Sequence, residues 1–407
     1  MIKREEYMKR IRPFIGKDVI KVLTGLRRSG KSVMLDLIQE ELLDKDVLAE
    51  QFITYNFEDL RHRHLLTAES LHAAVLEQVE ALDGLQTYIF LDEIQEVAEW
   101  ERVVNSLRVS VNCDIYITGS NANLLSSELA THLAGRYVEF VIYPFSFREF
   151  KDSYEDLTPP LQLPEGRSLF MEYIDLGGMP YLGRLAFDHA ASQIYLRDLF
   201  NSAVLKDVVS RNEIRDVDLL ERILAYTFVH TGNEFSASSI SRFFKSEGRT
   251  VARETILNYL SYCVDAFLLY QVKKFDIQGK RMLAVNEKFY IADHGIREAV
   301  LGGKTRDINL ILENIIYLEL LRRDYKVTVG RVGDLEVDFV AEKQDKRLYL
   351  QVSYLLASPE TIEREFRVFD KIKDHHTKMV LSLDSIDMSR DGIRHESIPR
   401  FLLSDDW

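Results

Sequence analysis

The first 150 residues alternate short apolar runs with longer stretches in which apolar residues recur at helical spacing. The apolar-rich runs are 19–24, 52–57, 88–93, 114–119 and 137–142. Continuous runs of this length are typical of strands that are buried on both faces of a parallel sheet. The stretch 33–43 has the apolar spacing of a helix. We therefore predict that residues 1–150 form a three-layer α/β domain, with five parallel strands and helices between them.

After residue 150 the pattern becomes mainly helical and then mixed. We expect a helical lid and connector over 151–216. Residues 217–297 have the pattern of a winged helix-turn-helix: Ser236 caps a short helix at 237–246, Gly248 breaks it, and a longer helix follows at 250–264. Two apolar stretches around a polar tip at 278–280 are expected to pair as the wing. Residues 298–407 are expected to form a further small α/β domain.

Composition narrows the class of protein. The chain has 407 residues, is 46% hydrophobic and carries a formal net charge of −13. It has no apolar window of the roughly 18 residues that a membrane span needs, and no apolar signal region near its start. Cys113 and Cys263 lie far apart in apolar segments, which favours reduced thiols in a cytoplasmic protein. The acidic total argues against indiscriminate coating of nucleic acid, although it allows a local basic face.

A phosphate-binding motif lies between the first predicted strand and the first helix. Residues 25–32 read Gly-Leu-Arg-Arg-Ser-Gly-Lys-Ser and match G-x-x-x-x-G-K-[ST]. In this P-loop the backbone N–H groups and the helix N-terminus bind phosphates. We expect Lys31 to reach the β- and γ-phosphates and Ser32 to ligate Mg²⁺. The predicted nucleotide-binding residues are Gly25, Arg27, Arg28, Ser29, Gly30, Lys31 and Ser32.

Two carboxylates end the predicted strand at 88–93. A buried parallel strand delivers residues at its end to the carboxyl edge of the sheet, where ligands bind. We expect Asp92 to hold the Mg²⁺ shell and Glu93 to polarise the attacking water. At the end of the next predicted strand, Ser120 or Asn121 is placed to sense the γ-phosphate, and the sequence does not choose between them.

These motifs together resemble the AAA+ superfamily, and more narrowly prokaryotic AAA_14-like ATPases whose P-loop reads G-x-R-R-x-G-K-[ST]. The matching segments are Arg27–Arg28, Leu91–Gln95, Thr118–Asn121, Leu133–Arg136 and Tyr143–Phe150. The resemblance implies ATP and Mg²⁺ as ligands and assembly into a homo-oligomer. It also implies that Arg136, 16 positions after Ser120, is an arginine finger that acts on a neighbouring subunit. The alternative is an ordinary surface or ion-pair arginine.

Related signalling ATPases carry a Gly-x-Pro element in the lid that approaches adenine. Gly178-Met179-Pro180 resembles this element, which makes Pro180 a candidate adenine contact. A plain helix-breaking turn is the alternative.

The predicted winged helix is locally basic. Residues 234–290 hold nine Lys and Arg against six Asp and Glu, within a chain of net charge −13. This balance suits contact with a DNA backbone, although winged helices also bind proteins. The candidate DNA-binding residues are Arg242, Lys245, Arg249, Arg253, Lys280 and Arg281, and Lys273 and Lys274 are expected on the same exposed face.

The last hundred residues resemble the PD-(D/E)xK nuclease fold, which accompanies this ATPase group as a domain of unassigned function. Glu313 and Asp338 fit the first two acidic positions of its motif. The third position should read [DE]-x-K but reads Gln351-Val352-Ser353, so a ligand charge and the lysine are missing. We therefore expect a degenerate site that does not cleave DNA, with no convincing replacement for the lysine.

The sequence thus predicts Mg²⁺-dependent ATP hydrolysis coupled to conformational change. The first hypothesis is a DNA-associated AAA+ motor or switch that acts on duplex or branched DNA. The alternatives are a STAND-like signalling ATPase that binds a protein partner, and an ATP-regulated nuclease. The N-terminal helix at 4–15 has two open roles, packing over the nucleotide or simple scaffolding.

Overall fold

The computed structural model describes residues 2–122, 135–159, 161–163, 165–302, 307–405 and 407. The chain packs into two compact units, the first of residues 1–143 with 265–267 and the second of 144–264 with 268–407. The first unit ends close to the predicted end of the first domain at residue 150. The finer division of the second half stays a prediction.

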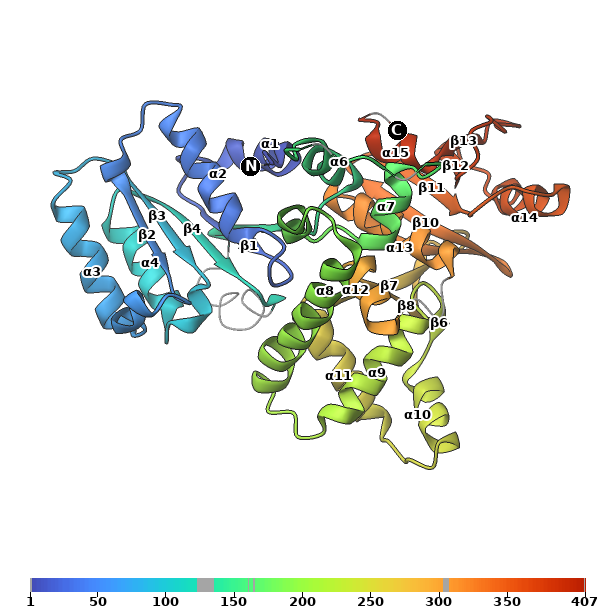
Figure 1. Cartoon of the computed structure of the whole chain (residues 1–407), viewed down its shortest axis with the longest axis horizontal. Helices are drawn as coiled ribbons and strands as arrows, with labels where there is room; N and C mark the ends of the chain where they lie inside the picture. Colours follow the sequence, from blue (N-terminus) through green and yellow to red (C-terminus); the bar gives the residue numbers. More distant parts are fainter. Residues whose placement is uncertain (1, 123–134, 160, 164, 303–306, 406) are drawn as a thin grey trace. The chain divides into compact units, whose positions relative to one another are not determined.

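A five-stranded sheet in the order β2-β3-β4-β1-β5 forms the centre of the first unit (Figure 1, blue to cyan). The strands are β1 (Ile20–Thr24), β2 (Phe52–Asn56), β3 (Thr87–Asp92), β4 (Cys113–Gly119) and β5 (Tyr137–Val141). Every pairing within this sheet is parallel, which confirms the predicted topology.

The helices of this unit are α1 (Glu5–Ile11), α2 (Lys31–Leu43), α3 (Ala68–Glu80) and α4 (Trp100–Ser110). Helix α4 buries one apolar stripe, formed by Trp100, Val103, Val104 and Leu107. This stripe packs in one core with Leu71 and Val75 of α3 and with strand residues such as Ile89. Burial of this stripe and of the fully apolar strands is the main force that holds the layers together.

The strand register sets which loops meet. Thr24 pairs with Gly119 and Asn56 pairs with Asp92, so β1, β2, β3 and β4 all end at one edge of the sheet. The phosphate-binding loop and the end of β3 therefore share that edge. Tyr137 pairs with Ile20 at the start of β1, which places the beginning of β5 at the opposite edge.

Helices make up the first half of the second unit. They are α6 (Phe147–Glu155), α7 (Leu169–Leu176), α8 (His189–Ala203), α9 (Val217–Val229), α10 (Ala237–Ser246), α11 (Arg253–Asp265) and α12 (His294–Leu301). Ser146 and Glu149 form a capping box at the start of α6: Glu149 N donates to Ser146 Oγ (3.1 Å), and Ser146 N donates to Glu149 Oε2 (2.8 Å). This explains part of the Tyr143–Phe150 motif. The helix predicted at 237–246 is confirmed as α10.

A mixed sheet fills the other half of this unit, in the order β13-β12-β11-β10-β9-β7-β8-β6. Its strands are β6 (Glu234–Phe235), β7 (Leu269–Asp276), β8 (Arg281–Ile291), β9 (Lys326–Val332), β10 (Leu335–Lys343), β11 (Lys346–Val352), β12 (Thr377–Ser382) and β13 (Arg394–Ser397). Its other helices are α13 (Ile308–Arg322), α14 (Pro359–Asp370) and α15 (Ile398–Leu403).

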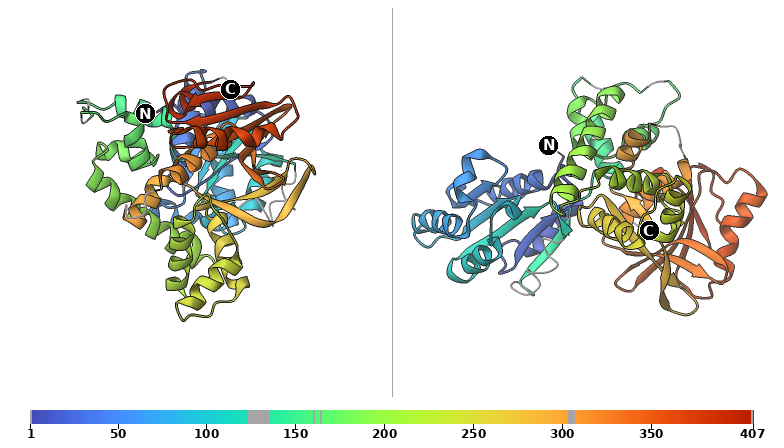
Figure 2. Two further views of the ribbon diagram at one scale, coloured as in Figure 1. Left: turned by 90° about the vertical axis from the view of Figure 1, so that its right-hand side faces the viewer. Right: turned by 90° about the horizontal axis from the view of Figure 1, so that it is seen from below.

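The predicted wing is part of this sheet (Figure 2, gold to red). Strands β7 and β8 form the expected antiparallel hairpin, with Leu269 opposite Ile291. The outer edge of β7 then pairs in parallel with β9, through Lys274 and Val329. One mixed sheet therefore crosses residue 297, because the open edge of β7 pairs with β9. The division into domains at this residue stays a prediction.

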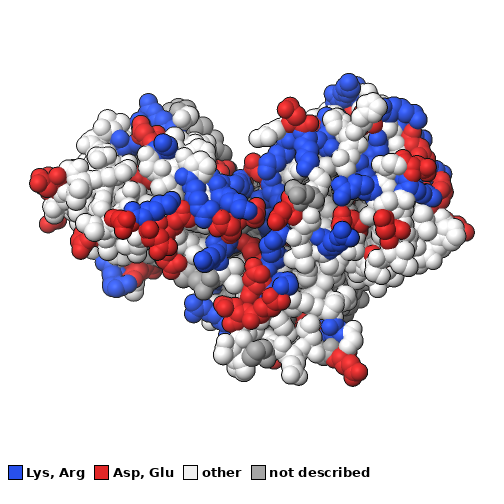
Figure 3. All heavy atoms as spheres, turned by 90° about the horizontal axis from the view of Figure 1, so that it is seen from above, with Lys and Arg blue, Asp and Glu red and all other residues white. Residues whose placement is uncertain are grey.

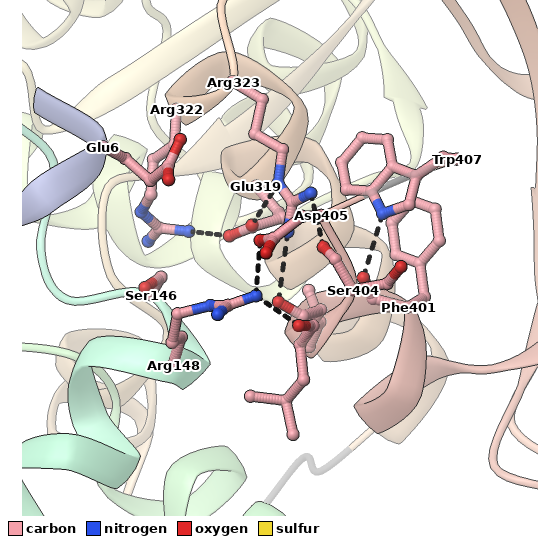
Figure 4. Close-up of polar contacts among 12 residues, drawn as sticks. Glu6, Ser146, Arg148, Glu319, Arg322, Arg323, Phe401, Ser404, Asp405 and Trp407 are labelled. Carbon is pink, nitrogen blue, oxygen red and sulfur yellow. Dashed lines mark hydrogen bonds and ion pairs between the residues drawn. The ribbon is translucent and has the colours of Figure 1, made fainter. Parts of the chain in front are cut away.

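The end of the chain is anchored on α6 and α13 (Figure 4). Arg323 donates to Ser404 O at 2.7 Å, and Arg148 donates to Asp405 Oδ1 at 2.7 Å. The ring of Trp407 stacks on Phe401 with 4.0 Å between centroids, and the Arg323 guanidinium lies 4.0 Å from the Trp407 ring. The terminal residues are thus part of the fold of the second unit.

Candidate functional site

The phosphate-binding loop has the strand-loop-helix geometry that its sequence predicts. It leaves β1 at Thr24, and α2 begins at Lys31. Gly25 has φ 137°, and a Cβ there would lie 2.3 Å from Ile142 O, so only glycine fits. Gly30 is the N-cap of α2 with φ 103°. Both glycines of the motif are therefore required by the backbone.

Lys31 lies buried against the loop and beside one of the predicted carboxylates. Its Nζ donates to Gly25 O at 3.2 Å and lies 3.4 Å from Glu93 Oε1. The sequence does not predict that Lys31 contacts Glu93. In the structure the start of α2 and the end of β3 lie side by side. A lysine in this position places a positive charge where phosphates meet the α2 N-terminus.

Asp92 is buried and fixed by hydrogen bonds from neighbouring strands. Thr118 Oγ1 donates to Oδ1 at 2.6 Å, and Asn56 Nδ2 donates to Oδ2 at 2.9 Å. Burial raises the pKa of Asp92 above its usual value. Hydrogen bonds to Thr118 and Ser32 lower this pKa, but the effect of burial is larger. A carboxylate and a hydroxyl at this spot are hard oxygen donors, which fit a magnesium ion.

Glu93 directly follows β3 in a left-handed backbone conformation, with φ 54°. Gln95 Nε2 donates to Glu93 Oε2 at 2.6 Å. Burial raises the pKa of Glu93, but the charge of Lys31 and the Gln95 hydrogen bond outweigh it, so the pKa lies below its ordinary value. Glu93 is therefore a carboxylate at neutral pH, as a general base must be.

Thr118 links the two acids and was missed in the sequence. It donates to Asp92 and accepts a hydrogen bond from Glu93 N at 2.9 Å. Asn56, which binds Asp92 from β2, was missed as well. Both residues could have been found from the sequence, because they lie near the ends of the strands that flank β3. Parallel strands in register bring such residues to the same edge of the sheet.

The structure places the two sensor candidates at the same edge without choosing between them. Ser120 and Asn121 follow β4 and are both buried. In the loop itself, Arg27 Nη1 pairs with Glu58 at 3.0 Å, and Arg28 is exposed. Leu133 and Ala134 of the Leu133–Arg136 motif lie outside the described residues.

Arg136 is not brought to Lys31 or Glu93 within the chain. It is exposed at the start of β5, where it donates to Asn105 Oδ1 at 3.2 Å. A five-residue strand separates this edge from the phosphate-binding loop, a distance of roughly 15 Å. Any action on a nucleotide would therefore be on that of another subunit, and the role of Arg136 stays a prediction.

The Gly177–Gly178 pair has a packing role in the second unit. Gly178 N donates to Asp293 Oδ2 at 2.7 Å, and Phe145 N donates to Gly178 O at 2.6 Å. A Cβ on Gly178 would lie 2.3 Å from Phe145 O. Pro180 begins the 3-10 turn Pro180–Leu185 and is half-buried. The glycines are thus explained by close packing, and the adenine contact of Pro180 stays a prediction.

Only some residues of the predicted basic face of the winged region are exposed. Its exposed members are Arg242, Lys245, Arg253, Lys273, Lys280 and Arg281. Arg249 is held in ion pairs with Asp216 (2.5 Å) and Asp218 (2.7 Å). Lys274 is buried between Glu234 and Glu336, so its expected place on the exposed face is wrong.

A second group of acids gathers in the second unit. Glu313 of α13, Glu336 and Asp338 of β10, and Gln351 of β11 line a pocket of about 350 Å³. Asp338 Oδ2 accepts from Val352 N at 2.8 Å, and Asp338 N donates to Gln351 Oε1 at 3.3 Å. The three predicted residues of the degenerate nuclease motif therefore do share one pocket.

A buried lysine from the wing pairs with two of these acids. Lys288 Nζ lies 2.6 Å from Glu336 Oε1 and 3.7 Å from Glu313 Oε2. Burial raises the pKa of Glu313 to about 7, although Lys288 lowers it, and burial also raises that of Asp338. The sequence analysis did not identify Lys288, because β8 lies far from the motif in sequence, and the absence of a replacement for the motif lysine stays a prediction. Among the described residues no group of three or more His, Cys, Asp or Glu is arranged to hold a metal ion.

Comparison with known proteins places these sites in context. Residues 17–151 match the family model described as an AAA domain (AAA_14), and 167–307 match a domain of unknown function, DUF8612. An uncharacterized protein of Haemophilus influenzae is 37% identical over 382 residues, covering 94% of this chain and 93% of that protein. The chain belongs to this family of AAA-domain proteins. An uncharacterized protein of Methanocaldococcus jannaschii is 30% identical over 398 residues, covering 95% and 85%.

The AAA domain includes the P-loop and Asp92–Glu93, while DUF8612 ends before β9. Solved structures with some likeness include the Aeropyrum pernix ORC2 protein, at 11% identity and a TM-score of 0.41, covering 78% of this chain and 93% of that one. The Aeropyrum pernix ORC1 protein in complex with DNA has 14% identity and a TM-score of 0.32, covering 74% and 92%. In the described part of the chain no helix is long and apolar enough to cross a membrane. Cys113 is partly buried and Cys263 is buried.

Proposed function

We propose that this AAA-domain protein hydrolyses ATP with Mg²⁺. The observation that carries the proposal is the meeting of Lys31, Asp92 and Glu93 at one edge of a parallel sheet, with Lys31 Nζ 3.4 Å from Glu93. A glycine loop that binds phosphate through its backbone lies at the same edge. These are the parts that phosphoryl transfer to water requires.

Each residue has a distinct task in this proposal. The loop N–H groups and Lys31 bind the phosphates, and Ser32 and Asp92 would hold Mg²⁺, which neutralises charge on the phosphate oxygens. Glu93 orients the attacking water and accepts its proton at a carboxylate oxygen. Thr118 holds the Asp92 carboxylate and the backbone of Glu93 in place. Ser120 or Asn121 contacts the γ-phosphate, and Arg136 acts on the nucleotide of a neighbouring subunit in a homo-oligomer.

We further propose that hydrolysis is coupled to DNA. The support is the set of exposed basic residues on α10, α11 and the tip of the β7–β8 hairpin, among them Arg242, Lys245 and Lys280. A helix pair with a wing is a common means of holding DNA through its phosphates. Figure 3 shows Lys and Arg interspersed with Asp and Glu over the face drawn, so this face is not uniformly basic.

The test is steady-state ATP hydrolysis at low salt, without DNA and with single-stranded, duplex and four-way-junction DNA. Glu93→Gln serves as the blank. Stimulation by one form of DNA that fades as salt rises is the expected result. Hydrolysis that no DNA changes would overturn the coupling and leave the ATPase proposal intact.

A second candidate, a signalling ATPase that binds a protein partner, is favoured by one observation. Four of the nine basic residues in 234–290 are already paired with acids: Arg249, Lys274, Arg281 and Lys288. The winged region therefore has less unpaired positive charge than its composition indicates. This candidate predicts slow turnover, retained nucleotide and partner binding that depends on ATP. For the nuclease-like pocket we propose no cleavage, because Gln351-Val352-Ser353 lacks the acid and lysine of the motif and Lys288 is held in ion pairs with Glu313 and Glu336.

A further inference from the structure

A buried arginine precedes α1 and lies outside the residues given a task above. Arg4 is 3% exposed, and its backbone is left-handed (φ 46°) at the N-cap of α1. Its Nη1 donates to Ser29 O at 2.8 Å, and its Nη2 donates to Tyr143 O at 2.7 Å. One guanidinium thus joins the phosphate-binding loop to the chain that follows β5.

Helix α1 holds this arginine firmly. Tyr7, Met8 and Ile11 are buried, and the Arg4 guanidinium lies 4.6 Å from the centre of the Tyr7 ring. Tyr7 Oη accepts a hydrogen bond from Tyr143 N at 3.1 Å, so Tyr143 is bound at both its N–H and its carbonyl. A cation stacked on an aromatic face and bound to two carbonyls has little freedom to move.

The contact with Ser29 O bears directly on phosphate binding. The Ser29 carbonyl and the Gly30 N–H belong to one planar trans peptide, so the two groups point in opposite directions. Gly30 has no side chain and φ 103°, so the loop itself resists rotation of this peptide only weakly. By holding the carbonyl, Arg4 fixes the direction of an N–H that belongs to the phosphate cradle.

The other end of the loop is anchored on the same segment. Ile142 N donates to Thr24 O at 2.7 Å, and Ile142 O fills the space where Gly25 would carry a Cβ. The loop is therefore tied at both ends to residues 142 and 143, directly at Gly25 and through Arg4 at Ser29. A guanidinium can span two carbonyls in this way because its donors form a rigid planar fork.

We propose that Arg4 is a positioning residue for ATP, which it does not touch. It orients the Ser29–Gly30 peptide so that the Gly30 N–H faces the phosphates, which answers the open role of the N-terminal helix. The inference rests on the proposed ATP binding. It predicts that loss of Arg4 weakens binding of ATP and ADP, whereas turnover at saturating ATP changes little.

Arg4→Met and Arg4→Lys are the variants that test this. Lys9→Ala is the matched control, because Lys9 is exposed on the same helix. Equilibrium binding of ATP and ADP is measured together with KM and kcat. We expect Kd and KM to rise about 10- to 100-fold in Arg4→Met, in keeping with the loss of charge-assisted hydrogen bonds. Arg4→Lys, which keeps one donor charge, is expected to lie between Arg4→Met and the parent.

The outcomes separate this inference from the proposal beneath it. A parent protein that binds no ATP overturns the proposed function. A parent that binds ATP, with an Arg4→Lys variant of unchanged Kd and KM, overturns the role of Arg4, and this variant decides if Arg4→Met does not fold. A fall in kcat and melting temperature with an unchanged KM would make Arg4 a residue of the fold alone, which also contradicts the inference.

Discussion

Lys31 in the first unit and Lys288 in the second both lie beside carboxylates, but their surroundings differ. Lys31 follows a glycine loop and lies 3.4 Å from Glu93, next to the start of α2. Lys288 lies within strand β8, 2.6 Å from Glu336, and not at the start of a helix. The backbone cradle, rather than the pairing of a lysine with acids, distinguishes a site for phosphate from an internal ion pair.

The largest expected effect separates the two lysines. Lys31→Ala removes the charge that faces the phosphates and should weaken ATP binding by more than about 100-fold while leaving the fold intact. Lys288→Met should leave ATP binding unchanged and lower the free energy of unfolding by about 3 kcal/mol, because Glu313 loses its cation while Glu336 keeps Lys274. Calorimetric titration with ATP and denaturant unfolding measure the two effects.

Lys280→Met, at the exposed tip of the same hairpin, is the control for Lys288→Met. Weakened ATP binding in Lys288→Met, or an unfolded Lys31→Ala, would break the distinction between the two lysines.

Thr118→Val sharpens the account of the first site. It removes the hydroxyl that donates to Asp92 and accepts from Glu93 N, so both acids lose a support. We expect kcat to fall about 10-fold or more, with a smaller change in ATP affinity, and Thr118→Ser to restore most of it. Equal kcat values for the parent and Thr118→Val would show that the strand ends position the acids without this bridge.

Several parts of this account were predictable from the sequence, and others were not. The P-loop, Asp92 and Glu93 were predictable, because each lies where a local apolar run meets a short motif. The two acids at 313 and 338 came from a family resemblance, and the structure does place them in one pocket. The roles of Arg4, Thr118 and Lys288 depend on contacts between segments distant in sequence, and the pairing of β7 with β9 does so as well. Periodicity carries no information on such contacts.

The second site should also reveal itself through pH. Burial raises the pKa of Glu313 to about 7 from an ordinary value of 4.5. The folded state therefore binds more protons than the unfolded state between pH 4.5 and 7, so this group's contribution to stability falls as pH rises through that window. The side chain of Glu313→Gln cannot ionise. We therefore expect this variant to reduce the change in unfolding free energy across that pH window by roughly 1–3 kcal/mol.

Unfolding free energies of the parent and Glu313→Gln, measured from pH 5 to 8, give the comparison. Parallel pH profiles for the two proteins would contradict an uncharged, buried Glu313.

The central claim is that Glu93 is the base of an ATPase, and one measurement tests it directly. ATP binding and single-turnover hydrolysis are followed in the same samples of the parent and of Glu93→Gln, with Mg²⁺ present. The account predicts that both proteins bind ATP with affinities within about threefold, and that Glu93→Gln hydrolyses it at least about 100-fold more slowly. Hydrolysis by Glu93→Gln at the parental rate would contradict the account.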